Sequence, residues 1–205
     1  MPVKTGAAIT AVSCVAIGTQ MTILLRKQID FRLLAVPLSF ALLTIALGMR
    51  LLLMFPDRTL RVALAVLILS VTVFFFITQK YKIELKKSAF NGAVAGLLTG
   101  LSTGTYNIVG PFLSVYYFHT APSTLAYKAS LEFSYLVASL VSTGFHIYHG
   151  NFNQRVLPLI LASCLGALAA GSLGLKVFKK IDRAGIAKIV YFILPLLALI
   201  LLLKN

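Results

Sequence analysis

The chain has few charged residues and very few acids. Of its 205 residues 12% are charged, and Asp and Glu together number 5 against 19 Lys and Arg. Polar stretches are also scarce, since the longest polar connector covers only residues 79–88. A chain that is 59% hydrophobic, with a mean hydropathy of +0.94, cannot bury its apolar surface as a soluble domain of this size. The composition therefore predicts a polytopic membrane protein embedded in a lipid bilayer.

Motifs for covalent, metal and nucleotide chemistry are missing as well. Two cysteines occur, Cys14 and Cys164, each inside an apolar segment without Cys or His neighbours at metal-ligand spacing. The sequence contains no Walker loop, no HExxH, no GxSxG and no dinucleotide fingerprint. These absences argue against an enzyme and against ATP-driven transport, and we expect no metal and no cofactor.

The basic residues concentrate in short connections between apolar segments. The formal net charge of +14 therefore does not indicate nucleic-acid binding, because this is the pattern of cytoplasmic loops in membrane proteins. We expect a multi-pass protein of the inner (plasma) membrane with no nucleic-acid partner. The predicted fold is a single all-α membrane bundle over residues 1–205. Its seven hydrophobic elements are 6–25, 33–55, 59–79, 89–118, 124–148, 155–177 and 186–203.

The element at 89–118 is interrupted in its middle. The interrupting residues are Gly100, Gly104, Asn107, Gly110 and Pro111. As one straight helix the segment would be about 45 Å long, whereas the hydrocarbon core of a bilayer is about 30 Å thick. The segment is too long to cross the membrane once and too short to cross it twice. We therefore predict a broken, re-entrant hairpin. Non-helical backbone at membrane depth is buried in protein or lines a watery cavity, and half-helix N-termini there attract anions.

The positions of Lys and Arg separate two topologies for residues 89–118. If the segment crosses once, both faces of the membrane carry about equal positive charge. If it returns to the face that it entered, one face collects most of the basic residues between Arg26 and Lys188. The other face then keeps Lys4, Arg50, Arg58, Arg61, Arg155 and Lys204. Such asymmetry is typical of membrane proteins, so the re-entrant hairpin is favoured, with both termini outside.

The chain also resembles itself at an offset of about 119–125 residues, as internally repeated transporters do. Arg32 pairs with Arg155 and Gly48 with Gly171, and each repeat runs from a span through a basic turn into a span that contains glycine. The alternative is a chance match between apolar segments. The predicted repeats cover 5–80 and 89–203. The first is truncated, because nothing equivalent to the hairpin precedes it.

Three stretches resemble the TauE/SafE sulfite exporter family. Residues Gly104–Phe112 resemble its glycine-rich signature, Tyr127–Ser130 its Arg-Ala-Thr stretch, and Gly166–Gly174 its Gly-xxx-Gly span. The resemblance implies a duplicated helical bundle that moves sulfite, sulfonates and related small anions. Two features differ from the family: its first glycine-rich element is absent, and Asn107 and Val109 replace two signature glycines.

Candidate substrate contacts gather around the interruption. They are Gly104, Tyr106, Asn107, Gly110, Pro111 and Lys128. Freed backbone N–H groups would hold an anion there, or the small residues would only let helices approach. Asn107 either donates its amide to the anion or caps the broken helix, and Tyr106 either offers its hydroxyl or packs. Lys128 either attracts substrate at the mouth of the path or is a solvated interfacial lysine.

Glu132 lies four residues after Lys128, on the same helical face. Because carboxylates inside membrane spans are rare and costly, we expect it to carry a coupled proton, with a structural ion pair to Lys128 as the alternative. His146 and His149 are expected to be interfacial residues at the far end of that span, with a proton-relay role as the alternative. The polar residues of the first span are expected to line a cavity opposite the hairpin; they are Ser13, Thr19, Gln20 and Thr22.

Taken together, these patterns predict a secondary membrane transporter. Its expected substrate is a small anion such as sulfite or an organosulfonate, and a proton carried by Glu132 can be coupled to its export. The alternative is a non-transporting membrane subunit derived from such a transporter. That alternative would assemble as a homodimer or with a second membrane subunit.

Overall fold

The computed structural model describes residues 2–80, 86–152, 156–178, 180 and 185. In this part of the chain the ordered elements are all helical. They are α1 (Val3–Leu25), the 3-10 turn η1 (Arg26–Gln28), α2 (Phe31–Met54), α3 (Asp57–Lys80), α4 (Ala89–Tyr106), α5 (Gly110–Thr120), α6 (Thr124–Tyr148) and α7 (Leu157–Phe178). The all-α prediction is confirmed. The predicted span at 186–203 lies outside the described residues.

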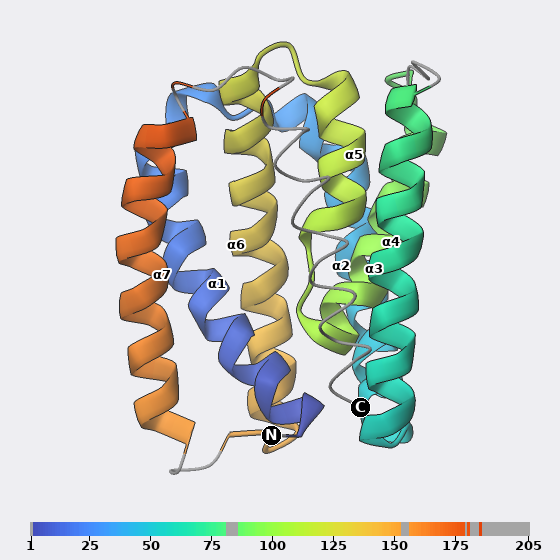
Figure 1. Cartoon of the computed structure of the whole chain (residues 1–205), viewed down its shortest axis with the longest axis vertical. Coiled ribbons are helices and arrows are strands. Elements are labelled where there is room, and N and C mark those ends of the chain that lie inside the picture. The colour runs from blue at the N-terminus through green and yellow to red at the C-terminus, as the bar shows by residue number, and fades with distance from the viewer. Residues whose placement is uncertain (1, 81–85, 153–155, 179, 181–184, 186–205) are drawn as a thin grey trace.

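Successive helices alternate in direction along one axis of the bundle (Figure 1). Helices α4 and α5 run antiparallel, so that the start of α4 and the end of α5 lie at the same end of the bundle, as a hairpin requires. By length and composition three segments can cross a membrane, namely Val3–Gln28, Phe31–Met54 and Leu157–Phe178, among the residues that the structure describes. The number of crossings and the internal repeat stay predictions.

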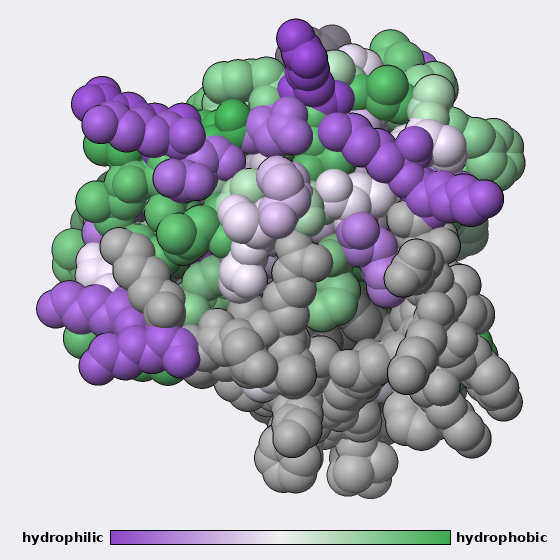
Figure 2. All heavy atoms as spheres, turned by 90° about the horizontal axis from the view of Figure 1, so that it is seen from above, coloured by the Kyte–Doolittle hydropathy of each residue, from purple (hydrophilic) through white to green (hydrophobic). Residues whose placement is uncertain are grey.

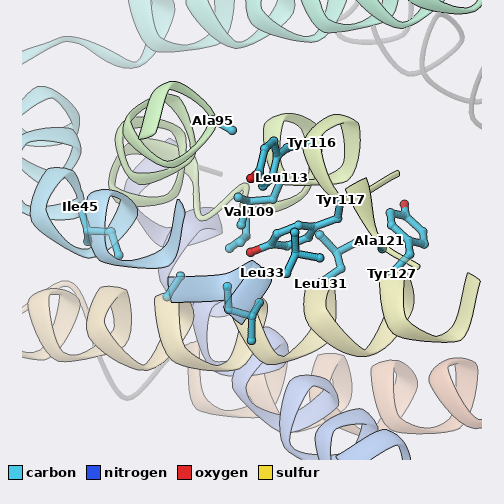
Figure 3. Close-up of a cluster of buried hydrophobic side chains, with 12 residues drawn as sticks. Leu33, Ile45, Ala95, Val109, Leu113, Tyr116, Tyr117, Ala121, Tyr127 and Leu131 are labelled. Atoms are coloured by element: carbon cyan, nitrogen blue, oxygen red, sulfur yellow. The ribbon is translucent and has the colours of Figure 1, made fainter. Parts of the chain in front are cut away.

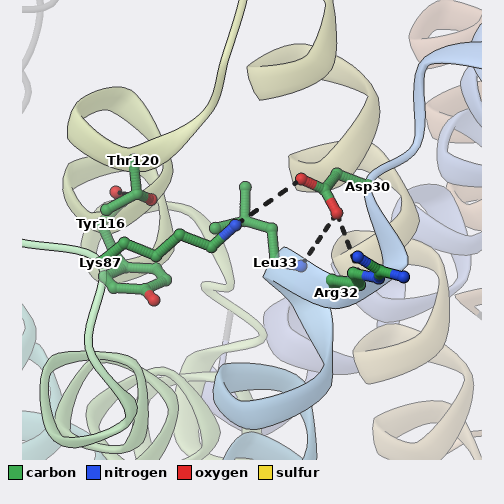
Figure 4. Close-up of polar contacts among 6 residues, drawn as sticks. All are labelled: Asp30, Arg32, Leu33, Lys87, Tyr116 and Thr120. Atoms are coloured by element: carbon green, nitrogen blue, oxygen red, sulfur yellow. Dashed lines mark hydrogen bonds and ion pairs between the residues drawn. The ribbon is translucent and has the colours of Figure 1, made fainter.

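Side-chain caps define where the hairpin and its neighbours begin. Asp30 precedes α2, and its carboxylate accepts the N–H groups of Arg32 and Leu33, both at 3.1 Å. The second Asp30 oxygen lies 4.0 Å from the Lys87 ammonium (Figure 4). Ser88, the next residue, caps α4. The beginnings of α2 and α4 are therefore held side by side by capping and charge, at one end of the bundle.

Helix α4 packs on α2 through a stripe of glycines four residues apart. The stripe consists of Gly92, Gly96, Gly100 and Gly104. A Cβ atom on Gly100 would clash with the Ala41 carbonyl oxygen, and one on Gly104 would lie 2.7 Å from the Met49 nitrogen. Small residues at this spacing let two helix backbones approach closely, which is the usual way in which membrane helices pack without a hydrophobic driving force.

Helix α5 is embedded in the apolar core. Leu113 and Tyr117 are fully buried in a cluster that also contains Leu33 of α2 and Leu131 of α6 (Figure 3). The buried Tyr117 hydroxyl forms a 3.0 Å hydrogen bond with the Ser134 hydroxyl of α6. The short returning arm of the hairpin is thus clamped between α2, α4 and α6, and the interruption before it is held at a defined place.

One end of the bundle is rimmed by hydrophilic side chains (Figure 2). This is the end at which α1 finishes and α2, α4 and α6 begin. The basic residues of these helix ends are Arg26, Lys27, Arg32, Lys86, Lys87, Lys128, Lys176 and Lys180. The described opposite end carries Lys4, Arg50, Arg58 and Arg61. This arrangement has the asymmetry that we expect when α4 and α5 return to one face.

We expected the polar residues of α1 to line a cavity opposite the hairpin. Two of them bind α7 instead. Ser13 donates to Ser163 and Gln20 to Ser172, both at 2.8 Å, while Thr19 is exposed and bonds within its own helix. The prediction was wrong for Ser13 and Gln20 because hydroxyl and amide groups between membrane helices take the nearest partner across the interface. It stays untested for Thr22, whose buried hydroxyl has no partner among the described residues.

Candidate anion site at the hairpin interruption

The interruption begins with a left-handed residue. Asn107 has φ 53° and ψ 40°, and its N–H donates to the Thr103 carbonyl at 2.7 Å. The N–H of Ile108 donates to the Ser102 carbonyl at 3.3 Å, and the Ser102 hydroxyl donates to the Ile108 carbonyl at 2.7 Å. Asparagine tolerates this backbone conformation better than most residues, so α4 ends here with the carbonyls of Ser102 and Thr103 satisfied.

Helix α5 then begins without a side-chain cap. Val109 occupies the N-cap position and makes no capping hydrogen bond, and Pro111 lies in the first turn. The first backbone N–H groups of a helix have no acceptor within it and form the positive end of its dipole. The Tyr135 hydroxyl of α6 lies against this end, because a Cβ atom on Gly110 would clash with it. Gly110 therefore allows a phenol and a helix N-terminus to meet.

The Asn107 side chain faces the interior. It is 2% exposed, its amide nitrogen lies 3.4 Å from the Ser139 hydroxyl of α6, and its amide oxygen has no partner among the described residues. The Cys14 thiol of α1 also interacts with Ser139 and Asn107. The backbone of Asn107 thus caps α4, and its amide points into a junction of α1, α6 and the interruption. Donation of this amide to an anion stays a prediction.

Lys128 and Glu132 form the ion pair that their spacing predicts. The Lys128 side chain is 24% exposed and the Glu132 side chain only 3%. One Glu132 oxygen contacts the ammonium, while the other has no partner in the described part of the chain. The ammonium also lies 5.7 Å from the centre of the Phe178 ring. The Glu132 carboxylate is therefore buried with a partner for only one of its two oxygens, whereas the Lys128 ammonium reaches the basic end of the bundle.

These groups belong to one polar stripe along α6. Its members follow each other at alternating steps of four and three residues: Lys128, Glu132, Tyr135, Ser139, Ser142 and His146. Residues so spaced share one helical face. Sequence reasoning used the first two, treated His146 as a residue of the span end and missed Tyr135, Ser139 and Ser142, although this polar periodicity was visible in the chain. We call this set the α6 polar stripe.

Other predicted site residues have contacts elsewhere. The Tyr106 hydroxyl donates to the Leu60 carbonyl of α3 at 2.8 Å, so it ties the end of α4 to a neighbouring helix. Gly104 faces α2. His146 is fully buried rather than interfacial, because its ring packs beside Phe152 and is covered by the loop after α6. Among the described residues no group of His, Cys, Asp and Glu could hold a metal ion.

A separate cavity of about 390 Å³ lies among α3, α4 and α5. Its lining is Ser70, Val71, Phe90, Asn91, Val94, Ala95, Leu98, Phe112, Val115 and Tyr116. Because these side chains are mostly apolar, a small anion that left water for this cavity would find few hydrogen-bond donors. The polar junction at Asn107 is chemically the better site.

The all-helical bundle, its long apolar segments and its antiparallel broken hairpin are features of a membrane transport protein. The chain belongs to the sulfite exporter TauE/SafE family, whose model matches residues 1–201. The resemblance seen in the glycine-rich segment is thus confirmed over nearly the whole chain. No curated protein and no solved structure matches the chain.

Proposed function

We propose that this protein is a secondary transporter of the inner (plasma) membrane that exports a small anion, sulfite or an organosulfonate, together with proton movement. The observation that carries the proposal is the junction at the interruption. There an uncapped helix N-terminus, the Asn107 amide and the hydroxyls of Tyr135 and Ser139 meet inside the bundle. Family membership supports the class of substrate.

The junction suits an oxyanion for a simple reason. An anion that loses its water needs several fixed hydrogen-bond donors, and the first turn of α5, the amide nitrogen of Asn107 and nearby hydroxyls are donors of this kind. Pro111 contributes no N–H, so Gly110 and the residues after Pro111 supply the backbone donors. Most of the charge compensation at the junction must then come from the helix dipole, because Lys128 lies eleven residues before Ser139 on α6, about 16 Å away along the helix axis, and acts at the basic end of the bundle.

Glu132 couples proton binding to anion binding through its ion pair with Lys128. While the carboxylate is ionised, it holds the ammonium in the ion pair. Protonation neutralises Glu132 and weakens its hold, so that the full positive charge of Lys128 becomes available to an anion. Anion binding should therefore strengthen as the pH falls on the side from which Glu132 takes its proton, and weaken as the pH rises.

Flux through the purified protein in liposomes tests this function. Sulfite and a small organosulfonate are compared under an imposed pH gradient, because the sulfonate stays anionic throughout and so reports on protonation of the protein alone. Glu132→Gln mimics the protonated state; it should retain anion binding and lose the response to the gradient. A response as large as that of the wild type in this variant would contradict the role of Glu132, and absence of flux from folded wild type would contradict transport.

A non-transporting subunit is the second candidate, and one observation favours it. Among the described residues of α7 only Leu175 is buried, and a Cβ atom on Gly166 or Gly174 would meet nothing within 4 Å. Exposed small residues on a membrane helix are suited to receive another helix. A second copy or another membrane subunit that co-purifies in fixed ratio, together with absence of flux from this chain alone, would favour this candidate.

A further inference from the structure

The far half of the α6 polar stripe holds polar atoms that the anion junction does not use. Beyond Ser139 the buried hydroxyls of Ser142 and Thr143 and the Nε2 atom of His146 have no hydrogen-bond partner among the described residues. All three groups lie within one turn of helix, and both Ser142 and His146 are 0% exposed. A buried polar atom without a partner costs about 1–3 kcal/mol unless water or a solute satisfies it, so this segment favours a hydrated path.

His146 ends that path, and its two ring nitrogens have different surroundings. Nδ1 lies 3.0 Å from the Asn151 side-chain amide nitrogen, on the loop after α6, whereas Nε2 is buried. Asn151 is itself held, because its backbone N–H donates to the His146 carbonyl at 2.9 Å. An amide can donate to a neutral imidazole and, after it turns over, accept from an imidazolium. Asn151 can therefore partner the ring in both protonation states.

We infer that His146 is the second proton-binding residue of the transporter, at the opposite end of the α6 polar stripe from Glu132. This inference rests on the proposed proton-coupled transport and extends it. A proton that arrives from the loop side binds Nδ1, and the proton on Nε2 leaves toward Ser142. One N–H bond forms as another breaks, so the ring passes one proton inward without a change in oxidation state.

Charged groups also lie around this end of the bundle. They are Lys4 on α1, Arg50 on α2, Asp57, Arg58 and Arg61 on α3, and His149 on α6 itself. The charge of His149 acts directly on His146. His149 is exposed and bonds to the Phe145 carbonyl, so it offers a matched control: a histidine of the same helix end that lies outside the buried path.

The test compares His146→Gln with His149→Gln in liposomes, with a small organosulfonate as the transported probe. Gln keeps a polar side chain of similar length, but its amide takes up no proton in the pH range of a transport assay. We expect His146→Gln to bind the probe like the wild type and to show gradient-driven flux lower by roughly a hundredfold or more, the low end of what one proton-transfer group contributes. His149→Gln removes a neighbouring charge but no group of the buried path, so its gradient-driven flux should stay close to that of the wild type. Gradient-driven flux in His146→Gln equal to that of the wild type would overturn the inference while transport itself stood.

A second measurement does not depend on transport. The protein is labelled with ¹⁵N at histidine in bilayers, and hydrogen exchange of the His146 Nε2–H is followed by NMR, with assignment through the His146→Gln spectrum. Exchange within seconds supports a path from this atom to water. Protection for hours overturns the inference, whether or not flux is found. If wild type gives no flux and exchange is fast, the proposed function fails and only the hydrated path survives.

Discussion

The two faces of the hairpin differ in how completely they are filled. On the face toward α2, glycines of α4 lie so close to the opposite backbone that even a methyl group has no room. On the face toward α6, Asn107 meets Ser139 over a long 3.4 Å contact, and its amide oxygen has no described partner. Nothing can bind where the packing is complete. The incompletely satisfied face is where a ligand gains hydrogen bonds.

The contrast separates two uses of glycine in one signature. Gly100 and Gly104 are needed for helix packing, whereas Gly110 makes room for a tyrosine hydroxyl at a helix N-terminus. A common motif therefore contains both structural and site-forming positions. Substitutions on the α2-facing and the α6-facing side of the hairpin test this assignment of packing and site-forming positions. The largest effect is expected on the packed α2-facing side and the smallest at the far end of the α6 polar stripe.

The largest effect is expected on the packed face. Gly104→Ala places a methyl group against the Ile45 carbonyl and 2.7 Å from the Met49 nitrogen, where backbone atoms must move. We expect a loss of about 1–3 kcal/mol in unfolding free energy, as for other overpacked sites. Thermal unfolding of the purified protein in detergent measures it. Gly166→Ala, on a helix face with nothing within 4 Å, is the control and should not lower stability, since alanine favours a helix interior over glycine by about 0.5–1 kcal/mol.

The second effect concerns Asn107. Asn107→Gly retains a backbone that accepts a positive φ but removes the amide, so stability should change by less than about 1 kcal/mol. Loss of one hydrogen bond to an anion should weaken sulfite binding by roughly tenfold. Calorimetric titration of sulfite into the purified protein measures the affinity. Unchanged affinity would mean that Asn107 serves only as the backbone cap of α4 and that its amide takes no part in binding.

Tyr135→Phe should have a smaller effect. It removes the hydroxyl beside Gly110 and keeps the ring that packs there. We expect sulfite affinity to fall by roughly threefold, as for a neutral hydrogen bond, with little change in thermal stability. Tyr106→Phe is the matched control, because its hydroxyl binds the Leu60 carbonyl instead. Equal losses of affinity in both variants would show that neither hydroxyl contacts the anion specifically.

The smallest change in stability is expected for Ser142→Ala. Its buried hydroxyl has no described partner, so the loss of that hydroxyl should change the unfolding free energy by about 0.5 kcal/mol or less. Flux measured under a pH gradient should nevertheless decrease if this hydroxyl contributes to the hydrated path. A substantial loss of stability with unaffected flux would instead assign Ser142 to helix packing.

The sequence was most informative about local structure. Glycine and proline around Asn107 predicted an interruption between residues 100 and 111, and the structure ends α4 at Tyr106 and begins α5 at Gly110. The pairing of Lys128 with Glu132 followed from their four-residue spacing, and it is present. Both outcomes depend on residues close together in the chain, so local rules of backbone conformation and helical spacing suffice.

Partners across helices could not be predicted in this way. The spacing of Gly104 and Gly110 suggested one common role, and nothing local indicated that α2 covers the first while Tyr135 reaches the second. His146 seemed interfacial because it is near the end of a span, yet the loop that follows folds back and buries it. Such contacts depend on how each helix is rotated about its axis and on which helix lies beside it.

By itself, the sequence determined the membrane class, the helices and the place where the hairpin breaks, because hydropathy and the backbone preferences of Gly, Pro and Asn act locally. Only the tertiary structure decided which face of the hairpin is packed and which is open to a ligand. It also brought Cys14 of α1 to Asn107 and Ser139. These residues are far apart in the chain, and close helix packing through small residues sets their distances.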